Sequence, residues 1–330
     1  MKQERSIYDV TRYPISVGIL LSLVVGSLAI WRWSGENLSL SESIVTPSFW
    51  GGYIYDWQVA HSGWARTISA SILFYLAMKM GILTKKFNLM GRSTHLPFDI
   101  FLLLSFGILL NVSYLRFALM ALVVSWSLSL FFSSYRSANS AKWLFDGGFY
   151  LGLLPMFYPP ALLLCALMPF VLILFERTLR EALVALLGVV TIPFGYIYVR
   201  WCMGGEFSTP LQQFSHDLMT HSEFRFESLF DNITIAIVVM VLYSALNAIL
   251  VSSLLDNTPK AKRRLRVVIV MSLLMGAMLL LPSADSTIFG LLAIPLSILV
   301  TVTLLKSPRW LSFILYWGLI ISVVGKYILA

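Results

Sequence analysis

Long apolar runs follow one another along almost the entire chain, and they constrain the fold more than any other feature. A helix that crosses the hydrocarbon of a bilayer needs about 20 mostly apolar residues. Runs of this kind, bounded by charged or turn-forming residues, predict helices over residues 14–31, 66–84, 98–112, 115–133, 144–157, 159–175, 178–201, 232–254, 266–282, 285–305 and 309–328. The sequence therefore predicts an all-α, polytopic membrane protein with about eleven transmembrane helices in a single transmembrane domain, 1–330.

Composition argues against several other classes of protein. Hydrophobic residues make up 58% of the chain and charged residues 12%, which is too apolar for a water-soluble domain. The formal net charge is +8, but the bases are spread over short loops, so we predict no nucleic-acid partner. The two cysteines, Cys165 and Cys202, predict neither a structural disulfide nor a thiol metal site.

Lysine and arginine indicate how the chain is oriented, because basic loops stay in the cytoplasm. Besides the N-terminal segment, the basic loops are 84–97, 134–143, 176–177, 255–265 and 306–308. We therefore predict a cytoplasmic N-terminus and two long outer loops, 32–65 and 202–231. Nine of the 16 acidic residues are predicted to lie outside, nearly all of them in these two loops. Long loops among short ones usually carry the function.

Two segments of the chain depart from the pattern of simple spans and loops. Pro155, Pro159 and Pro160 interrupt the apolar stretch 144–175, which is therefore either two full spans or a broken element, because proline removes a backbone donor. In the second outer loop, the segment from Thr209 to Phe226 favours a short amphipathic helix on the outer surface.

The outer loops contain the first candidate site. Carboxylates at Asp56, Glu36 and Glu42 are candidate general bases toward an incoming hydroxyl, and arginines clamp phosphate through paired N–H donors. The predicted substrate-binding residues are Arg66, Arg200, Arg225 and His61. The alternative interpretation is that these are ordinary solvated loop charges beside aromatic anchors.

Other sites are less favoured by the sequence. His216, Asp217, His221 and Glu223 form a possible divalent-metal cluster, but their spacing suits a helical face poorly, so we predict no metal site and assign no cofactor. The predicted spans have no charge near their centres, which argues against an ion-coupled transporter.

Residues 142–194 contain a specific series of short motifs, preceded by the step HLPFD at 95–99. The series reads Phe-Asp-x-Gly-Phe, then Gly-Leu, then Phe-Tyr-Pro-Pro, then Arg-Glu before a glycine-containing helix that ends near Pro193. With these motifs the chain resembles an uncharacterised family of multispanning bacterial inner-membrane proteins, described as a domain of unknown function. The resemblance implies a multi-pass protein of the bacterial inner membrane.

The layout also resembles, more remotely, the GT-C class of lipid-linked-sugar glycosyltransferases. In that class a long first outer loop bears a catalytic acid, and a basic outer-face site binds a polyprenyl phosphate. The resemblance implies Asp56 as the acid, with Glu36 and Glu42 as alternates, and the outer arginines as the phosphate contact. The chain departs from the pattern because it has no Asp-x-Asp or adjacent acid pair.

We therefore expect an envelope-biogenesis protein of the inner membrane that handles a polyprenyl-phosphate-linked or glycolipid substrate at the outer face, in one version as a transferase. The expected partners are membrane lipids first and a membrane protein second. The alternative is a non-catalytic subunit or scaffold of an envelope complex, and a transporter ranks below both.

Overall fold

A computed structural model of the chain describes residues 17–21, 24, 26, 50–91, 94–108, 114–137, 139–219, 258–284 and 287–329. Every regular element in these ranges is helical. The predicted span 232–254 and most of the predicted span 14–31 lie outside the described residues. The elements are α2 (Gly51–Ala60), α3 (Ser62–Lys86), α4 (Leu96–Ile108), α5 (Tyr114–Ser134), α6 (Ser140–Phe157), η2 (Pro159–Ala161), α7 (Leu162–Cys165), α8 (Leu167–Leu174), α9 (Leu179–Cys202), α10 (Ser208–Met219), α12 (Pro259–Met278), α13 (Thr287–Lys306) and α14 (Arg309–Leu329).

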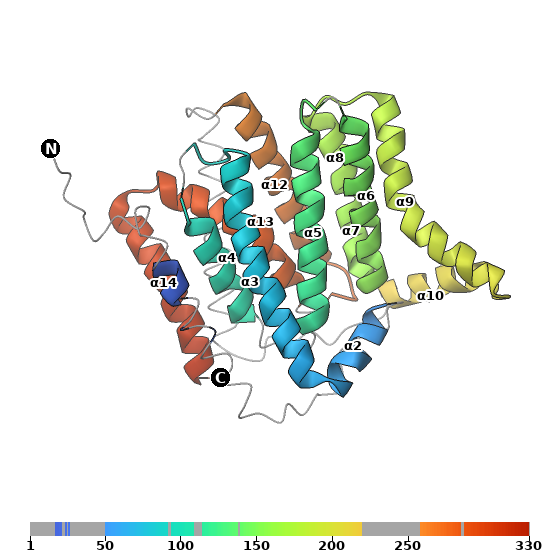
Figure 1. The fold of residues 1–330 in the computed structure, drawn as a ribbon, viewed down its shortest axis with the longest axis horizontal. Coiled ribbons are helices and arrows are strands. Elements are labelled where there is room, and N and C mark those ends of the chain that lie inside the picture. Colours follow the sequence, from blue (N-terminus) through green and yellow to red (C-terminus); the bar gives the residue numbers. More distant parts are fainter. Residues whose placement is uncertain are drawn as a thin grey trace.

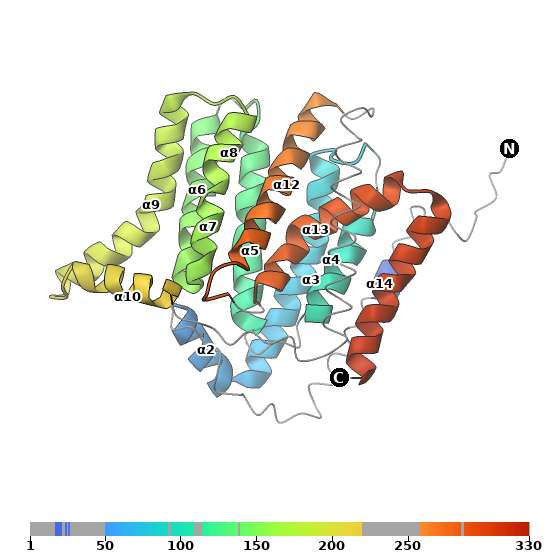
Figure 2. The same cartoon turned by 180° about the vertical axis from the view of Figure 1, so that it is seen from behind.

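The long helices pack side by side, and consecutive passes from α3 to α9 alternate in direction (Figure 1). The helices α12, α13 and α14 alternate in the same way on the other side of the bundle, as the reverse view confirms (Figure 2). Two short helices, α2 and α10, lie at the opposite end of the bundle from the start of α12 (Figure 1).

Three described helices, α3, α5 and α9, are long and apolar enough to cross a membrane. Shorter apolar helices occur at Leu96–Ser105, Pro159–Leu174, Gly290–Lys306 and Arg309–Ile321. The helical class predicted from the sequence is thus confirmed for the described residues, and the apolar helices are those of a membrane protein. The count of eleven spans stays a prediction.

The three candidate spans differ in how much of their apolar surface the bundle covers. Inside the molecule, 72% of the apolar window of α5 is buried, but only 11% of that of α9. The central position of α5 agrees with its contacts to α3, α6 and α13. Because α9 packs mainly on α6, most of its apolar surface faces outward, where hydrocarbon would solvate it.

Glycines determine how closely α9 approaches α6. A Cβ atom added at Gly152 would lie 2.0 Å from the carbonyl oxygen of Val189, and one at Gly188 would lie 2.3 Å from that of Phe145. At Gly148 the distance to the carbonyl oxygen of Ala185 would be 2.6 Å. Small residues four apart permit this backbone-to-backbone packing, which is common between membrane helices.

The segment 144–175 consists of one continuous helix, α6, followed by a broken one. Helix α6 ends at Phe157, and the Pro159–Pro160 step forms η2 in place of a regular helix because proline cannot donate the backbone hydrogen bond. The chain then returns through α7 and α8, which together run antiparallel to α6 (Figure 1). The sequence left open two full spans or a broken element. The structure shows a broken helix after α6, and the number of membrane spans in this segment stays a prediction.

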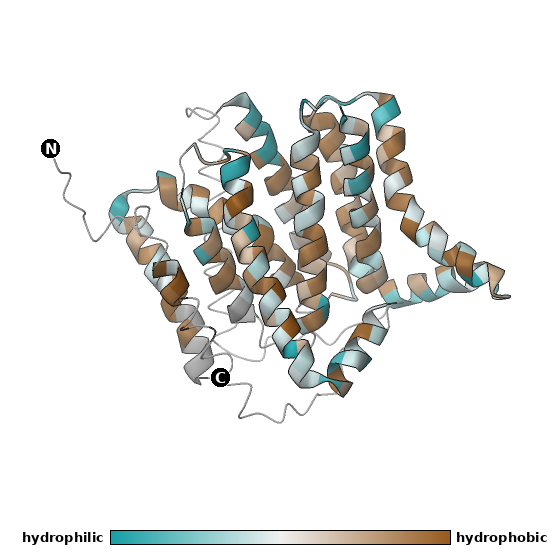
Figure 3. Ribbon diagram, viewed as in Figure 1, coloured by the Kyte–Doolittle hydropathy of each residue, from teal (hydrophilic) through white to brown (hydrophobic). Residues whose placement is uncertain are grey.

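Cations gather at the end of the bundle where α12 begins, which we call the basic end: Lys85, Lys86, Arg136, Arg177, Lys260, Lys262, Arg263 and Arg264. Figure 3 shows hydrophilic residues at these helix ends above mostly hydrophobic helices. All of these cations come from segments that the sequence predicts to be cytoplasmic, so the fold gathers them on one side.

Arginines at the basic end hold three helix C-termini together. Arg264 donates hydrogen bonds to the carbonyl oxygens of Phe87 and Phe132, each at 3.2 Å, at the ends of α3 and α5. Arg263 donates to the carboxylate of Glu176 at 2.7 Å, beyond the end of α8. This hydrogen bond and charge hold the pKa of the Glu176 carboxyl below its usual range. Guanidinium groups are well suited to these positions because the last carbonyls of a helix have no intrahelical donor.

Candidate apolar cavity and its polar rim

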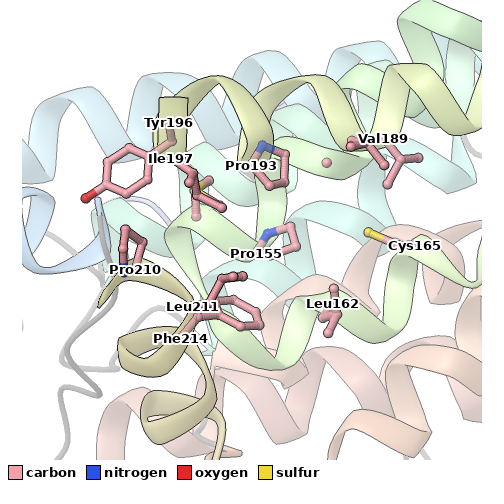
Figure 4. A pocket seen from close by; sticks show the side chains of 13 residues that line it. Pro155, Leu162, Cys165, Val189, Pro193, Tyr196, Ile197, Pro210, Leu211 and Phe214 are labelled. Atoms are coloured by element: carbon pink, nitrogen blue, oxygen red, sulfur yellow. The ribbon is translucent and has the colours of Figure 1, made fainter. Parts of the chain in front are cut away.

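An apolar cavity opens where α6 and α9 separate. It has a volume of about 250 Å³ and lies between α6, α7, α9 and the short helix α10 (Figure 4). Its lining is almost wholly hydrocarbon, with one thioether, one thiol and one phenol. The lining residues are Gly152, Pro155, Met156, Leu162, Cys165, Val189, Val190, Pro193, Tyr196, Ile197, Pro210, Leu211 and Phe214.

The sequence explains why the two helices first touch and then separate. The contact at Gly152 and Val189 comes just before Pro155 on α6 and Pro193 on α9. A proline inside a helix removes one backbone hydrogen bond and commonly bends the helix. Both prolines line the cavity and face each other across it in Figure 4.

Helix α10 supplies one wall of the cavity. Pro210, Leu211 and Phe214 point into it from α10, and α10 also contacts η2 (Figure 4). The helix has a polar side as well, and Gln212, at its centre, is exposed. This amphipathic helix confirms the helix predicted within 209–226 as far as the described residues reach.

A cation lies beside the phenol of the cavity. Arg200, in the last turn of α9, donates a hydrogen bond to the hydroxyl oxygen of Tyr196 at 3.4 Å, and Tyr196 lines the cavity. A cation in this turn is also stabilised by the negative end of the helix dipole. Arg200 is half-buried, so an anionic group at the end of the cavity can reach its guanidinium.

Three other predicted site residues lie together at the corner between α2 and α3. Asp56 and His61 are exposed, and His61 stacks on Trp57 with ring centroids 5.3 Å apart. Arg66, in the first turns of α3, is half-buried and forms a hydrogen bond with Tyr114 of α5.

The corner is fastened to α5 by polar contacts. The side-chain oxygen of Gln58 accepts a hydrogen bond from the backbone N–H of Leu115 at 3.1 Å. Tyr114 donates from its hydroxyl to the carbonyl oxygen of Ser62 at 3.3 Å. These contacts give Asp56, His61 and Arg66 a fixed position relative to the bundle.

The structure therefore divides the predicted outer site. Arg200 is in the last turn of α9, and this end of α9 lies apart from α2 in both views of the fold (Figures 1 and 2). Glu36, Glu42 and Arg225 lie outside the described residues, as do His221 and Glu223 of the metal cluster considered above.

Sequence reasoning missed two features at this end of the molecule. The first is the cavity: Gly152 and Pro193 belong to the motif series, but the motifs do not show that residues of four helices come together around a cavity. The second is Arg116, which is only 1% exposed and lies over the ring of Tyr158 at 5.4 Å. From sequence, a charged residue in the first turn of an apolar helix is expected to lie at the solvated helix end. Only the packing of the helices shows that Arg116 is buried.

Comparison with known proteins assigns the family. A model described as a family of unknown function (DUF6427) matches residues 58–329. The chain belongs to this family. A search of curated proteins and a search of solved structures each gave no match. The DUF6427 region contains every residue that lines the cavity, together with Arg66 and Arg200, whereas Asp56, Glu36 and Glu42 precede it.

Proposed function

We propose that this DUF6427 protein is a multi-pass protein of the bacterial inner membrane that takes part in envelope biogenesis. It binds one anionic lipid of the polyprenyl-phosphate or glycolipid class at the outer face. The observation that carries the proposal is the apolar cavity between α6, α7, α9 and α10 with Arg200 beside it.

The cavity suits a hydrocarbon chain. An engineered apolar cavity of about 150 Å³ stays dry and binds benzene. The cavity here, at about 250 Å³, is larger and mostly apolar, so it has room for a branched segment of a lipid chain rather than a whole lipid. Because α9 lies at the periphery of the bundle, the rest of the bound lipid's hydrocarbon chain can extend into the surrounding bilayer.

The headgroup end of such a lipid would lie near Arg200. Arginine binds phosphate through two parallel N–H donors, which makes it suited to this role. In the proposed orientation, with about eleven spans and a cytoplasmic N-terminus, the basic end is cytoplasmic. The helix α10 and the end of α9 that contains Arg200 lie at the opposite end of the bundle and would then be at the outer face (Figure 1).

Binding can be measured through the two native cysteines. Cys165 lines the cavity, and Cys202 is exposed at the end of α9. We expect farnesyl phosphate to slow the alkylation of Cys165 by N-ethylmaleimide in the nanodisc-embedded protein, with Cys202 as the internal control. Peptide mass spectrometry reports both rates. If Cys165 reacts equally fast with and without farnesyl phosphate, the lipid-binding proposal is wrong.

The role of Arg200 is tested in the same assay. Losing one charged hydrogen bond to phosphate costs about 1.5 kcal/mol, so Arg200→Gln should weaken protection by farnesyl phosphate about tenfold and leave protection by farnesol unchanged. Arg180→Gln, an exposed cation at the opposite end of α9, is the matched control. If the two variants weaken protection by farnesyl phosphate equally, Arg200 is not part of the binding site.

The transferase version of the proposal assigns general-base catalysis to Asp56, with Glu36 and Glu42 as alternates. Asp56 is exposed on α2, where an incoming hydroxyl can reach it. We expect simultaneous replacement of the three acids by their amides to abolish surface glycan in cells that depend on this protein. If such cells keep a normal level of surface glycan, the transferase version is wrong and only the lipid-binding proposal remains.

A further inference from the structure

A buried carboxyl group lies next to the cavity on α10. Asp217 follows Phe214 by three residues, so it continues the face of α10 that lines the cavity. Only 2% of the Asp217 side chain is exposed, while the neighbouring His216 side chain is 79% exposed. A short surface helix has thus buried its acid and exposed its imidazole.

The hydrogen bonds of this carboxyl group are incomplete. Its Oδ1 atom lies 3.8 Å from Nδ1 of His216, a long contact that is an ion pair only when the imidazole is protonated. Its Oδ2 atom is buried and accepts no hydrogen bond from any residue in the described part of the chain. Burial raises the pKa of the Asp217 carboxyl above its usual value, and His216 offsets part of that increase.

An incompletely paired buried carboxyl group is costly, and such groups in proteins generally have a partner. A ligand in the adjoining cavity can provide one. A sugar hydroxyl donates a hydrogen bond to a carboxylate and accepts one from a carboxylic acid, so it fits either protonation state. An ammonium headgroup would require the fully ionised form, which burial disfavours.

We propose that Asp217 binds a hydroxyl of a sugar-bearing headgroup on the lipid whose chain occupies the cavity. This inference rests on the proposed lipid site and specifies its substrate class. Arg200 would contact the phosphate from α9, and Asp217 would contact the sugar from α10. The ligand is then a prenyl phosphate that already carries sugar, rather than the bare phosphate.

The test compares two probes in the Cys165 protection assay: farnesyl phosphate and farnesyl phosphoryl mannose. We expect the wild-type protein to bind the mannose-bearing probe about tenfold more tightly, which corresponds to about one buried hydrogen bond. Asp217→Asn should remove this preference and leave binding of farnesyl phosphate unchanged. Asp217→Glu should restore part of the preference, and Gln212→Ala, on the opposite face of α10, should retain all of it.

The outcomes separate this inference from the lipid-binding proposal. If neither probe protects Cys165, the lipid site itself is wrong. If farnesyl phosphate protects Cys165 but farnesyl phosphoryl mannose binds no more tightly, only the role of Asp217 is overturned. If Asp217→Asn weakens the binding of both probes equally, Asp217 has a structural role instead. A wild-type preference for phosphatidylethanolamine over farnesyl phosphoryl mannose would assign Asp217 to an ammonium group and overturn the sugar assignment.

Discussion

Replacing Gly152 with alanine should weaken the contact between α6 and α9, because the added Cβ would meet backbone. It would lie 2.0 Å from the carbonyl oxygen of Val189, whereas ordinary contacts begin at 3.4 Å. The helices would have to separate by about 1.4 Å at this point, and a gap of about 1 Å already forfeits up to half of the attraction between packed atoms. Overpacking of this kind costs about 1–3 kcal/mol in free energy of unfolding.

Gly195→Ala is the matched control on the same pair of helices. Gly195 is in α9, and a Cβ added there would meet nothing within 4 Å. Alanine has the higher helix propensity, so this variant should be unchanged or more stable by up to about 1 kcal/mol.

Both variants can be compared by unfolding the purified protein in mixed micelles with increasing fractions of dodecyl sulfate, followed by far-UV circular dichroism. Two results would refute the reasoning. One is Gly152→Ala within about 0.5 kcal/mol of the wild-type protein, which is the range of neutral surface changes. The other is an equal loss of stability in Gly195→Ala.

Two further predictions concern the basic end and the orientation. Arg264→Gln removes two hydrogen bonds to the carbonyls that end α3 and α5, so it should lower the free energy of unfolding by about 2 kcal/mol in the same assay. Arg266→Gln, at an exposed position of the same helix, should lower the free energy of unfolding by less than about 0.5 kcal/mol. A larger decrease would show that the effect of Arg264→Gln comes from the lost charge and not from its hydrogen bonds. In a cysteine-free background, Ser215→Cys on α10 should react with an impermeant maleimide in intact spheroplasts. Lys86→Cys should react only after permeabilisation, and the reverse pattern would invert the proposed orientation.

Particular elements show how far sequence reasoning reached. The span predicted at 178–201 corresponds to α9, Leu179–Cys202, because an apolar run of sufficient length between a capping Thr178 and a basic last turn is a local signal. The outer loop predicted at 32–65 was less accurate. Its second half contains α2 and the start of α3, since short helices of mixed polarity resemble aromatic loops in sequence.

The candidate site shows where that reasoning stopped. Arg66 and Arg200 were both predicted as phosphate contacts, but a sequence gives no distance between loops, and the structure separates them. Asp217 was considered as a metal ligand because it lies in one short stretch with His216, His221 and Glu223. Its burial became visible only once α10 was placed against η2.

The sequence alone determined that this chain is helical and apolar enough for a bilayer, because hydrogen bonding and hydrophobicity act within each segment. It also identified the basic loops, since charge is a property of each residue. The cavity was decided by tertiary structure, because it depends on where Gly152, Pro155 and Pro193 place two helices relative to each other. Packing between distant segments also determined which polar groups became buried, because burial depends on neighbours that the order of residues does not specify.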